Sequence, residues 1–61
     1  MIHDVGYFAD GSLWFMNPYK DGLYCIKEQA HGGGDYVAWV GSRDDCENYV
    51  KQKNAMLRKR F

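Results

Sequence analysis

The sequence has few residues that could cross-link a small protein or bind a metal in it: its 61 residues include only two cysteines and two histidines, and a single proline. It also lacks any apolar run close to the roughly 20 residues that a membrane-spanning helix needs, so we predict no membrane span. No charged and then apolar leader is present, which predicts a cytoplasmic, reducing setting with free thiols. A chain this short forms a single domain, 1–61, and without such cross-links its small core calls for a partner subunit.

The residues with the right chemistry for zinc are scattered along the chain: Cys25, Cys46, His3 and His31. Zinc ribbons and fingers hold the metal with pairs of ligands only a few residues apart, and no such pair is present. Cys46 falls on an apolar helical stripe, which is typical of a free cysteine buried as a small hydrophobic residue. We therefore predict no metal site, no cofactor and no disulfide.

Catalytic motifs are missing as well. The run His31–Gly34 has the letters of the oxyanion loop of lipases, but the chain has no G-x-S-x-G nucleophile elbow to work with it. These glycines lie between two predicted strands, where a hairpin turn is the simpler interpretation. A cysteine nucleophile with a histidine base needs a pocket that so short a chain rarely builds. The sequence therefore predicts a protein that is not an enzyme.

Charge is balanced overall but unevenly spread. Residues 1–45 hold seven acidic side chains against three basic ones, a net of −4, and residues 46–61 hold five basic ones against Glu47, a net of +4. Such asymmetry is typical of a surface for nucleic acid or for an acidic partner. It is also ordinary helix chemistry, since basic residues favour a helix C-terminus.

Short apolar segments separated by turn residues predict the sheet. Asp10–Gly11 and Asp21–Gly22 are typical of tight turns, and Gly32–Gly34 of a hairpin tip. The strands predicted between these turns cover residues 2–8, 12–16, 23–29 and 35–40. Strict alternation in the last strand predicts Tyr36, Ala38 and Val40 on one face and Val37 and Trp39 on the other.

One long helix is predicted to close the chain. Ser42 is an N-cap candidate, and Asp44 and Asp45 follow in the first turn. Helical spacing then gives a single stripe of residues facing the sheet, with fraying expected near Arg58. The stripe consists of Cys46, Tyr49, Val50, Lys53, Met56 and Leu57. The predicted fold is α+β: an antiparallel sheet of three or four strands followed by one C-terminal α-helix packed on one face.

Both faces of the predicted sheet carry large apolar groups, but one helix covers only one face. An uncovered apolar face on a small protein is typical of an interaction site, and it predicts a homodimer or a tight complex with another protein. In the alternative interpretation, curling of the sheet or the N-terminal segment covers the second face.

These features favour a small non-enzymatic binding protein or inhibitor, of the kind found among phage proteins and antitoxin-type regulators, acting on an intracellular protein partner. Aromatic side chains next to acidic ones suit a basic groove on such a partner. The predicted partner-binding residues are Trp14, Tyr19, Tyr24, Tyr36, Trp39, Asp10, Asp21, Glu28 and Asp35. The alternative is nucleic-acid binding by the basic C-terminal helix, through Lys51, Lys53, Arg58, Lys59 and Arg60.

Overall fold

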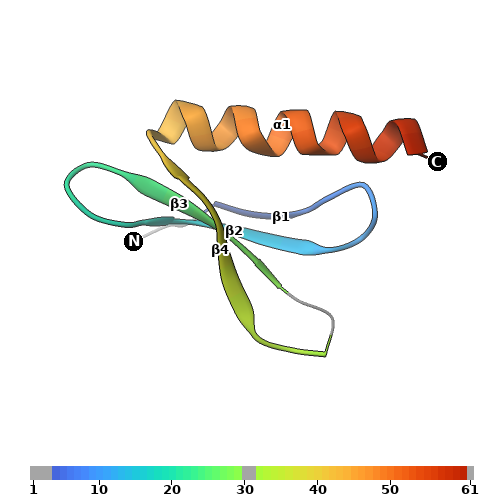
Figure 1. Cartoon of the computed structure of the whole chain (residues 1–61), viewed down its shortest axis with the longest axis horizontal. Helices are drawn as coiled ribbons and strands as arrows, with labels where there is room; N and C mark the ends of the chain where they lie inside the picture. Colours follow the sequence, from blue (N-terminus) through green and yellow to red (C-terminus); the bar gives the residue numbers. More distant parts are fainter. Residues whose placement is uncertain (1–3, 30–31, 61) are drawn as a thin grey trace.

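The computed structural model, which describes residues 4–29 and 32–60, has a four-stranded antiparallel sheet followed by one helix (Figure 1). The strands lie side by side in chain order: β1 (Asp4–Tyr7), β2 (Leu13–Pro18), β3 (Tyr24–Gln29) and β4 (Asp35–Gly41). Helix α1 (Arg43–Arg60) packs on one face, against β3 and β4. This confirms the predicted α+β fold and selects four strands. His3 and His31 lie outside the described residues.

The turns form where the sequence predicts them, because their residues tolerate a left-handed backbone. Gly11 has φ 89°, Asp21 has φ 48° and Gly22 has φ 77°. In the β1–β2 turn the Asp10 carboxylate accepts hydrogen bonds from the backbone N–H of Ser12 at 2.9 Å and from its hydroxyl at 2.6 Å. Strand β2 runs further than predicted because its pairing with β3 continues to Pro18.

A β-bulge in β4 corrects the predicted assignment of its faces. Ile26 pairs with Trp39, but the next residue, Lys27, pairs with Val37, so Ala38 is the extra residue. The bulge turns Tyr36 and Trp39 toward the helix and Val37 and Val40 away from it. The prediction placed Tyr36 and Trp39 on different faces of the sheet because it assumed unbroken alternation. One inserted residue shifts every later side chain to the other face.

Helix α1 begins as predicted and ends later than predicted. The Asp45 backbone N–H donates to Ser42 Oγ at 3.1 Å, which confirms the N-cap. The helix continues past Arg58 to Arg60, and its later turns are anchored where Asn54 Oδ1 accepts a hydrogen bond from the Ala9 N–H at 2.7 Å. Met56 is 60% exposed, so it does not belong to the sheet-facing stripe.

The core lies between the helix and the sheet. Its buried members come from the β1–β2 connection, the two central strands and the helix: Phe8, Met16, Ile26, Cys46 and Val50. Partly buried side chains pack around them and confirm that Tyr49 and Leu57 face the sheet: Trp14, Tyr24, Tyr49 and Leu57. At Gly6 a side-chain carbon would lie 2.9 Å from the Trp14 ring, so the indole occupies space that only glycine leaves free.

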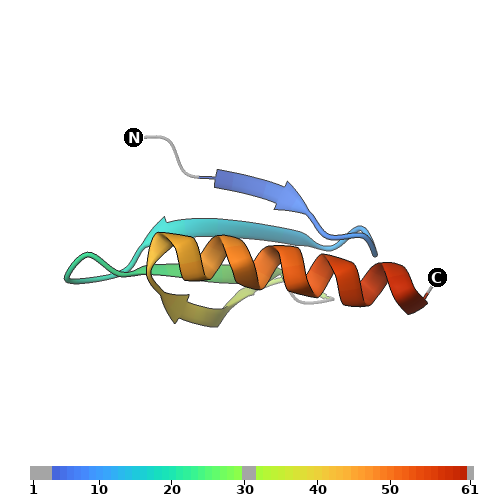
Figure 2. The ribbon, with the colours of Figure 1, turned by 90° about the horizontal axis from the view of Figure 1, so that it is seen from above.

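Strand β1 lies at the edge of the sheet, to one side of the helix (Figure 2). Two contacts tie this region to α1. Arg43 Nη2 lies 2.9 Å from Asp4 Oδ2 at the start of the helix, and the Ala9–Asn54 hydrogen bond holds the other end of the strand. The edge strand is therefore attached to the helix by polar contacts.

The face of the sheet turned away from α1, here called the open face, has no cover from the described residues. Six large apolar side chains on this side are between 36% and 71% exposed. They are Val5, Tyr7, Tyr19, Leu23, Val37 and Val40. Within the described part of the chain, no helix has the length and apolar character to cross a membrane.

Candidate partner-binding site

A buried carboxylate joins the sheet to the helix. Glu28 of β3 is only 4% exposed and accepts three hydrogen bonds. Its donors are the Tyr36 hydroxyl of β4 at 2.9 Å and, from α1, the Tyr49 hydroxyl at 2.6 Å and Lys53 Nζ at 2.5 Å. Every buried polar side-chain atom in the described residues has such a partner, so the Glu28 cluster is fully satisfied.

The electrostatics of this cluster favour the charged carboxylate. Burial alone raises the pKa of Glu28, but hydrogen bonds from Lys53, Tyr49 and Tyr36 outweigh burial and lower the pKa below its ordinary value. Burial and the Glu28 carboxylate raise the pKa of Tyr49, while the hydrogen bond to Glu28 raises that of Tyr36. Both phenols therefore stay protonated as donors, and the cluster fastens β3, β4 and α1 together.

Beside this cluster, aromatic side chains reach solvent where β4 meets the helix. We call this surface the aromatic edge; it consists of Tyr36, Trp39, Tyr49 and Met56. The Trp39 and Tyr49 rings stack, with centroids 5.4 Å apart and an interplanar angle of 11°. Tyr36 is 50% exposed, Trp39 43% and Met56 60%, so the surface is apolar and accessible. Stacking and the hydrogen bonds to Glu28 restrain the three aromatic side chains of this surface.

The aromatic edge is hollowed and carries a carboxylate. One hollow of about 290 Å³ is lined by Trp39, Asp45, Asn48, Tyr49 and Gln52, and a second of about 290 Å³ by Tyr49, Gln52, Lys53 and Met56. Gly41 makes room at the first: a side-chain carbon there would lie 3.2 Å from Trp39 Nε1 and 3.1 Å from Asp45 Cβ. The missing side chain lets the indole and the carboxylate share one end of the hollow.

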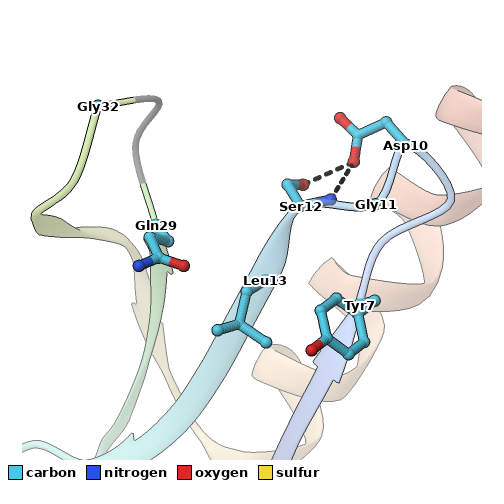
Figure 3. A pocket seen from close by; sticks show the side chains of 7 residues that line it. All are labelled: Tyr7, Asp10, Gly11, Ser12, Leu13, Gln29 and Gly32. Atoms are coloured by element: carbon cyan, nitrogen blue, oxygen red, sulfur yellow. Dashed lines mark hydrogen bonds between the residues drawn. The ribbon is translucent and has the colours of Figure 1, made fainter.

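A larger hollow, of about 550 Å³, lies elsewhere, between the β1–β2 turn and the β3–β4 connection (Figure 3). It is lined by Tyr7, Asp10, Gly11, Ser12, Leu13, Gln29 and Gly32. Its acidic group, Asp10, already accepts two hydrogen bonds from Ser12 within the turn, and these bonds lower the pKa of Asp10. The described residues that line this hollow include no basic side chain.

The nine predicted partner-binding residues do not share one surface. Three of them meet beneath and beside the helix: Glu28, Tyr36 and Trp39. Trp14 and Tyr24 pack against the core, and Tyr19 is half-exposed beyond the end of β2. The remaining three are exposed carboxylates on separate turns and at the start of β4: Asp10, Asp21 and Asp35.

The predicted basic surface is also divided. Lys53 is paired with Glu28, and its ammonium lies 4.7 Å from the centre of the Phe8 ring. Lys51, Arg58 and Lys59 are exposed along α1, while the side chain of Arg60 lies outside the described part. Pairing of Lys53 removes one cation from the footprint that nucleic acid would contact.

The two cysteines lie in the interior. Cys25 and Cys46 are buried free thiols, and burial raises the pKa of Cys46, which keeps it protonated. Among residues 4–29 and 32–60 no group of three or more His, Cys, Asp or Glu side chains lies close enough to hold a metal ion.

The sequence did not point to three members of this site: Asp45, Tyr49 and Met56. The sequence indicates only that Asp45 is an acidic residue of the first helical turn and that the other two belong to the apolar stripe. The available signal was the hydroxyl of Tyr49 on that stripe, since a buried phenol requires an acceptor nearby. Comparison with family models, with curated proteins and with solved structures finds no match for this chain, so its function is inferred from its own residues.

Proposed function

We propose that this protein is a small non-enzymatic binding module that recognises a basic segment of an intracellular protein partner through its aromatic edge. The observation that carries the proposal is the half-exposed Trp39 ring, stacked on Tyr49 and lining a hollow together with Asp45. Rigid, accessible aromatic side chains supply most of the energy at protein interfaces. A regulator or inhibitor of the partner is the simplest role for such a module.

Charge determines which partner suits this surface. Asp45 lines the hollow, and Asp44 precedes it in the first helical turn, so the Trp39 end of the edge is acidic. A lysine or arginine placed there would meet both the face of an indole ring and a carboxylate. An acidic segment would be repelled. We therefore infer a partner segment in which a basic side chain accompanies apolar ones that cover Met56.

Two further properties belong to the same proposal. Buried free thiols at Cys25 and Cys46 suit a reducing compartment, in keeping with an intracellular partner. Self-association of the chain would use the open face, which lies on the other side of the sheet from the aromatic edge.

Selection from a library of random peptides tests the proposal, because it requires no assumption about which protein the partner is. We expect the recovered peptides to be enriched in arginine or lysine beside apolar residues. Trp39→Ala should weaken the binding of the best peptide about thirtyfold, as expected for a central aromatic anchor. Asp45→Asn should weaken it less and should reduce its dependence on salt. Binding is measured by fluorescence anisotropy of the labelled peptide.

The matched control is Tyr19→Ala, because Tyr19 is 51% exposed but lies away from the aromatic edge. It should bind the peptide like the parent chain. Recovery of acidic peptides, or equal binding by Trp39→Ala, would reject the proposal. The competing function is nucleic-acid binding by Lys51, Arg58 and Lys59. Salt-sensitive binding to random duplex DNA at physiological ionic strength, lost on Lys51→Gln, would replace our proposal.

A further inference from the structure

The open face carries a large exposed apolar patch for so small a protein. Its six exposed apolar side chains include Tyr7 at 71%, Val5 at 58% and Val37 at 47%. Together the six leave on the order of 500 Å² of apolar surface, taking about 150–250 Å² for a large side chain that is fully exposed. This is near the upper end for the largest patch on a monomer, and such patches are commonly functional.

The charges on this face restrict what can cover it. Among the described strand residues whose side chains alternate onto the open face, the charged ones are Lys27 of β3 and Asp35 of β4. They lie diagonally across neighbouring strands, because Lys27 pairs with Val37 and Asp35 pairs with Gln29. Neither forms an ion pair with another described residue. A purely apolar cover would leave the Lys27 ammonium desolvated without a carboxylate, which is costly.

We propose that a second copy of this chain covers the open face, so that the protein is a homodimer with two sheets facing each other. A two-fold axis in the plane between the sheets exchanges the positions of Lys27 and Asp35. With the axis midway between these two side chains, Lys27 of each copy lies opposite Asp35 of the other, and the symmetry makes this contact occur twice. The face is thus complementary to itself in both apolar character and charge.

The area that this assembly would bury reaches the lower limit for a biological interface. Complete burial of the six exposed side chains in both copies removes about 1,000 Å² in total, which is about the minimum for such an interface. The partly buried Leu13 and Phe15 lie on the same face and add to this area. The helices would lie on the outside of the dimer, and each copy would keep its aromatic edge accessible. The dimer interface and the aromatic edge are different surfaces, so either proposal can fail without the other.

Sedimentation equilibrium on the full chain tests the proposal. We expect a species of twice 7.1 kDa at micromolar concentration. Val37→Glu should weaken self-association at least about a hundredfold, because the symmetric interface would bury the new charge twice. The fold of the single chain should survive, since Val37 is 47% exposed there and a Glu side chain at this position reaches water. The matched control, Met56→Glu, makes a similar change at an exposed position on the helix and should leave the dimer intact.

A charge exchange tests the register independently of that variant. Lys27→Asp makes the face wholly acidic and Asp35→Lys makes it wholly basic, so each variant alone should associate about tenfold more weakly than the parent chain. Mixed in equal amounts, the two should form a heterodimer more tightly than either forms a homodimer. If a substitution weakened association only by disturbing its own chain, mixing the two variants would not restore association.

Two results would overturn the proposal. One is a parent chain that stays at 7.1 kDa throughout the micromolar range. The other is a dimer that survives Val37→Glu and shows no preference in the mixed sample, which would place self-association on another surface such as the free edge of β1. If Val37→Glu does not fold, as judged by circular dichroism, the mixing experiment decides the matter.

Discussion

The two faces of the sheet carry similar residues but differ in how deeply these residues are buried. On the covered face Ile26 is 0% exposed and packs against Val50 of the helix, whereas on the open face Val37 is 47% exposed. Both faces are rich in apolar side chains, and both carry charge. The charged group under the helix, Glu28, has three donors, but Lys27 and Asp35 on the open face lack ion-pair partners among the described residues. The covered face satisfies its buried charge within one chain, whereas the charges of the open face remain accessible to water.

This contrast shows that apolar composition alone does not distinguish a buried face of the sheet from an exposed one. The hydrogen bonds of the charged groups do distinguish them, because a buried charge is tolerated only when its hydrogen bonds are made. Substitution of a valine or a carboxylate should therefore change the stability of the fold by an amount that depends on whether the side chain is buried or exposed.

The largest difference is expected between buried and exposed positions of the same helix. Val50→Asp places an unpaired carboxylate in the core and should remove most or all of the roughly 3–5 kcal/mol that a core of this size provides. Met56→Asp, at a position 60% exposed, should change stability little. Thermal melts followed by circular dichroism measure both. Similar melting of the two variants would show that the buried stripe is misplaced.

A smaller loss is expected from the polar part of the covered face. Glu28→Gln keeps the shape but removes the charge that pairs with Lys53, and should cost about 1–3 kcal/mol at neutral pH. The folded pKa of Glu28 lies below its ordinary value of 4.5. Its contribution is therefore complete above that value and is lost as the pH falls through the folded pKa. Urea unfolding across this pH range should show a shallower acid dependence in the variant.

Asp21→Asn is the matched control for that pH dependence, because it makes the same acid-to-amide change at an exposed turn. It should retain the acid sensitivity of the parent chain. If both variants lose stability in acid as steeply as the parent, Glu28 is not the group responsible.

The smallest effect is expected on the open face of the isolated chain. Val37→Thr should alter folding stability by less than about 0.5 kcal/mol, since the hydroxyl remains in water. The same change at the buried Val50 should cost about 1–3 kcal/mol, because its hydroxyl lacks a partner there. Tryptophan fluorescence during urea unfolding allows the comparison at concentrations too low for self-association. Equal losses at the two sites would mean that the open face is covered within one chain.

Local signals in the sequence predicted most of the elements. Asp10–Gly11 and Asp21–Gly22 form turns because their backbones tolerate positive φ, and Ser42 caps the helix through its hydroxyl. Such features depend on residues a few positions apart, so they can be predicted whatever the overall fold is. The surface on which a predicted partner-binding residue lies depends instead on packing, and Trp14 and Tyr24 are partly buried against the core.

The amino-acid sequence by itself determined a sheet of three or four strands, the capped helix and the presence of more apolar surface than one helix can cover. Only the tertiary structure decided which face is covered. The bulge at Ala38 reverses the alternation of β4, and it arises from the pairing of β4 with another strand, β3. It also decided that Glu28 is a buried anchor, because its donors come from positions 8, 21 and 25 residues away along the chain. Contacts at such distances depend on how the elements pack, which local patterns do not contain.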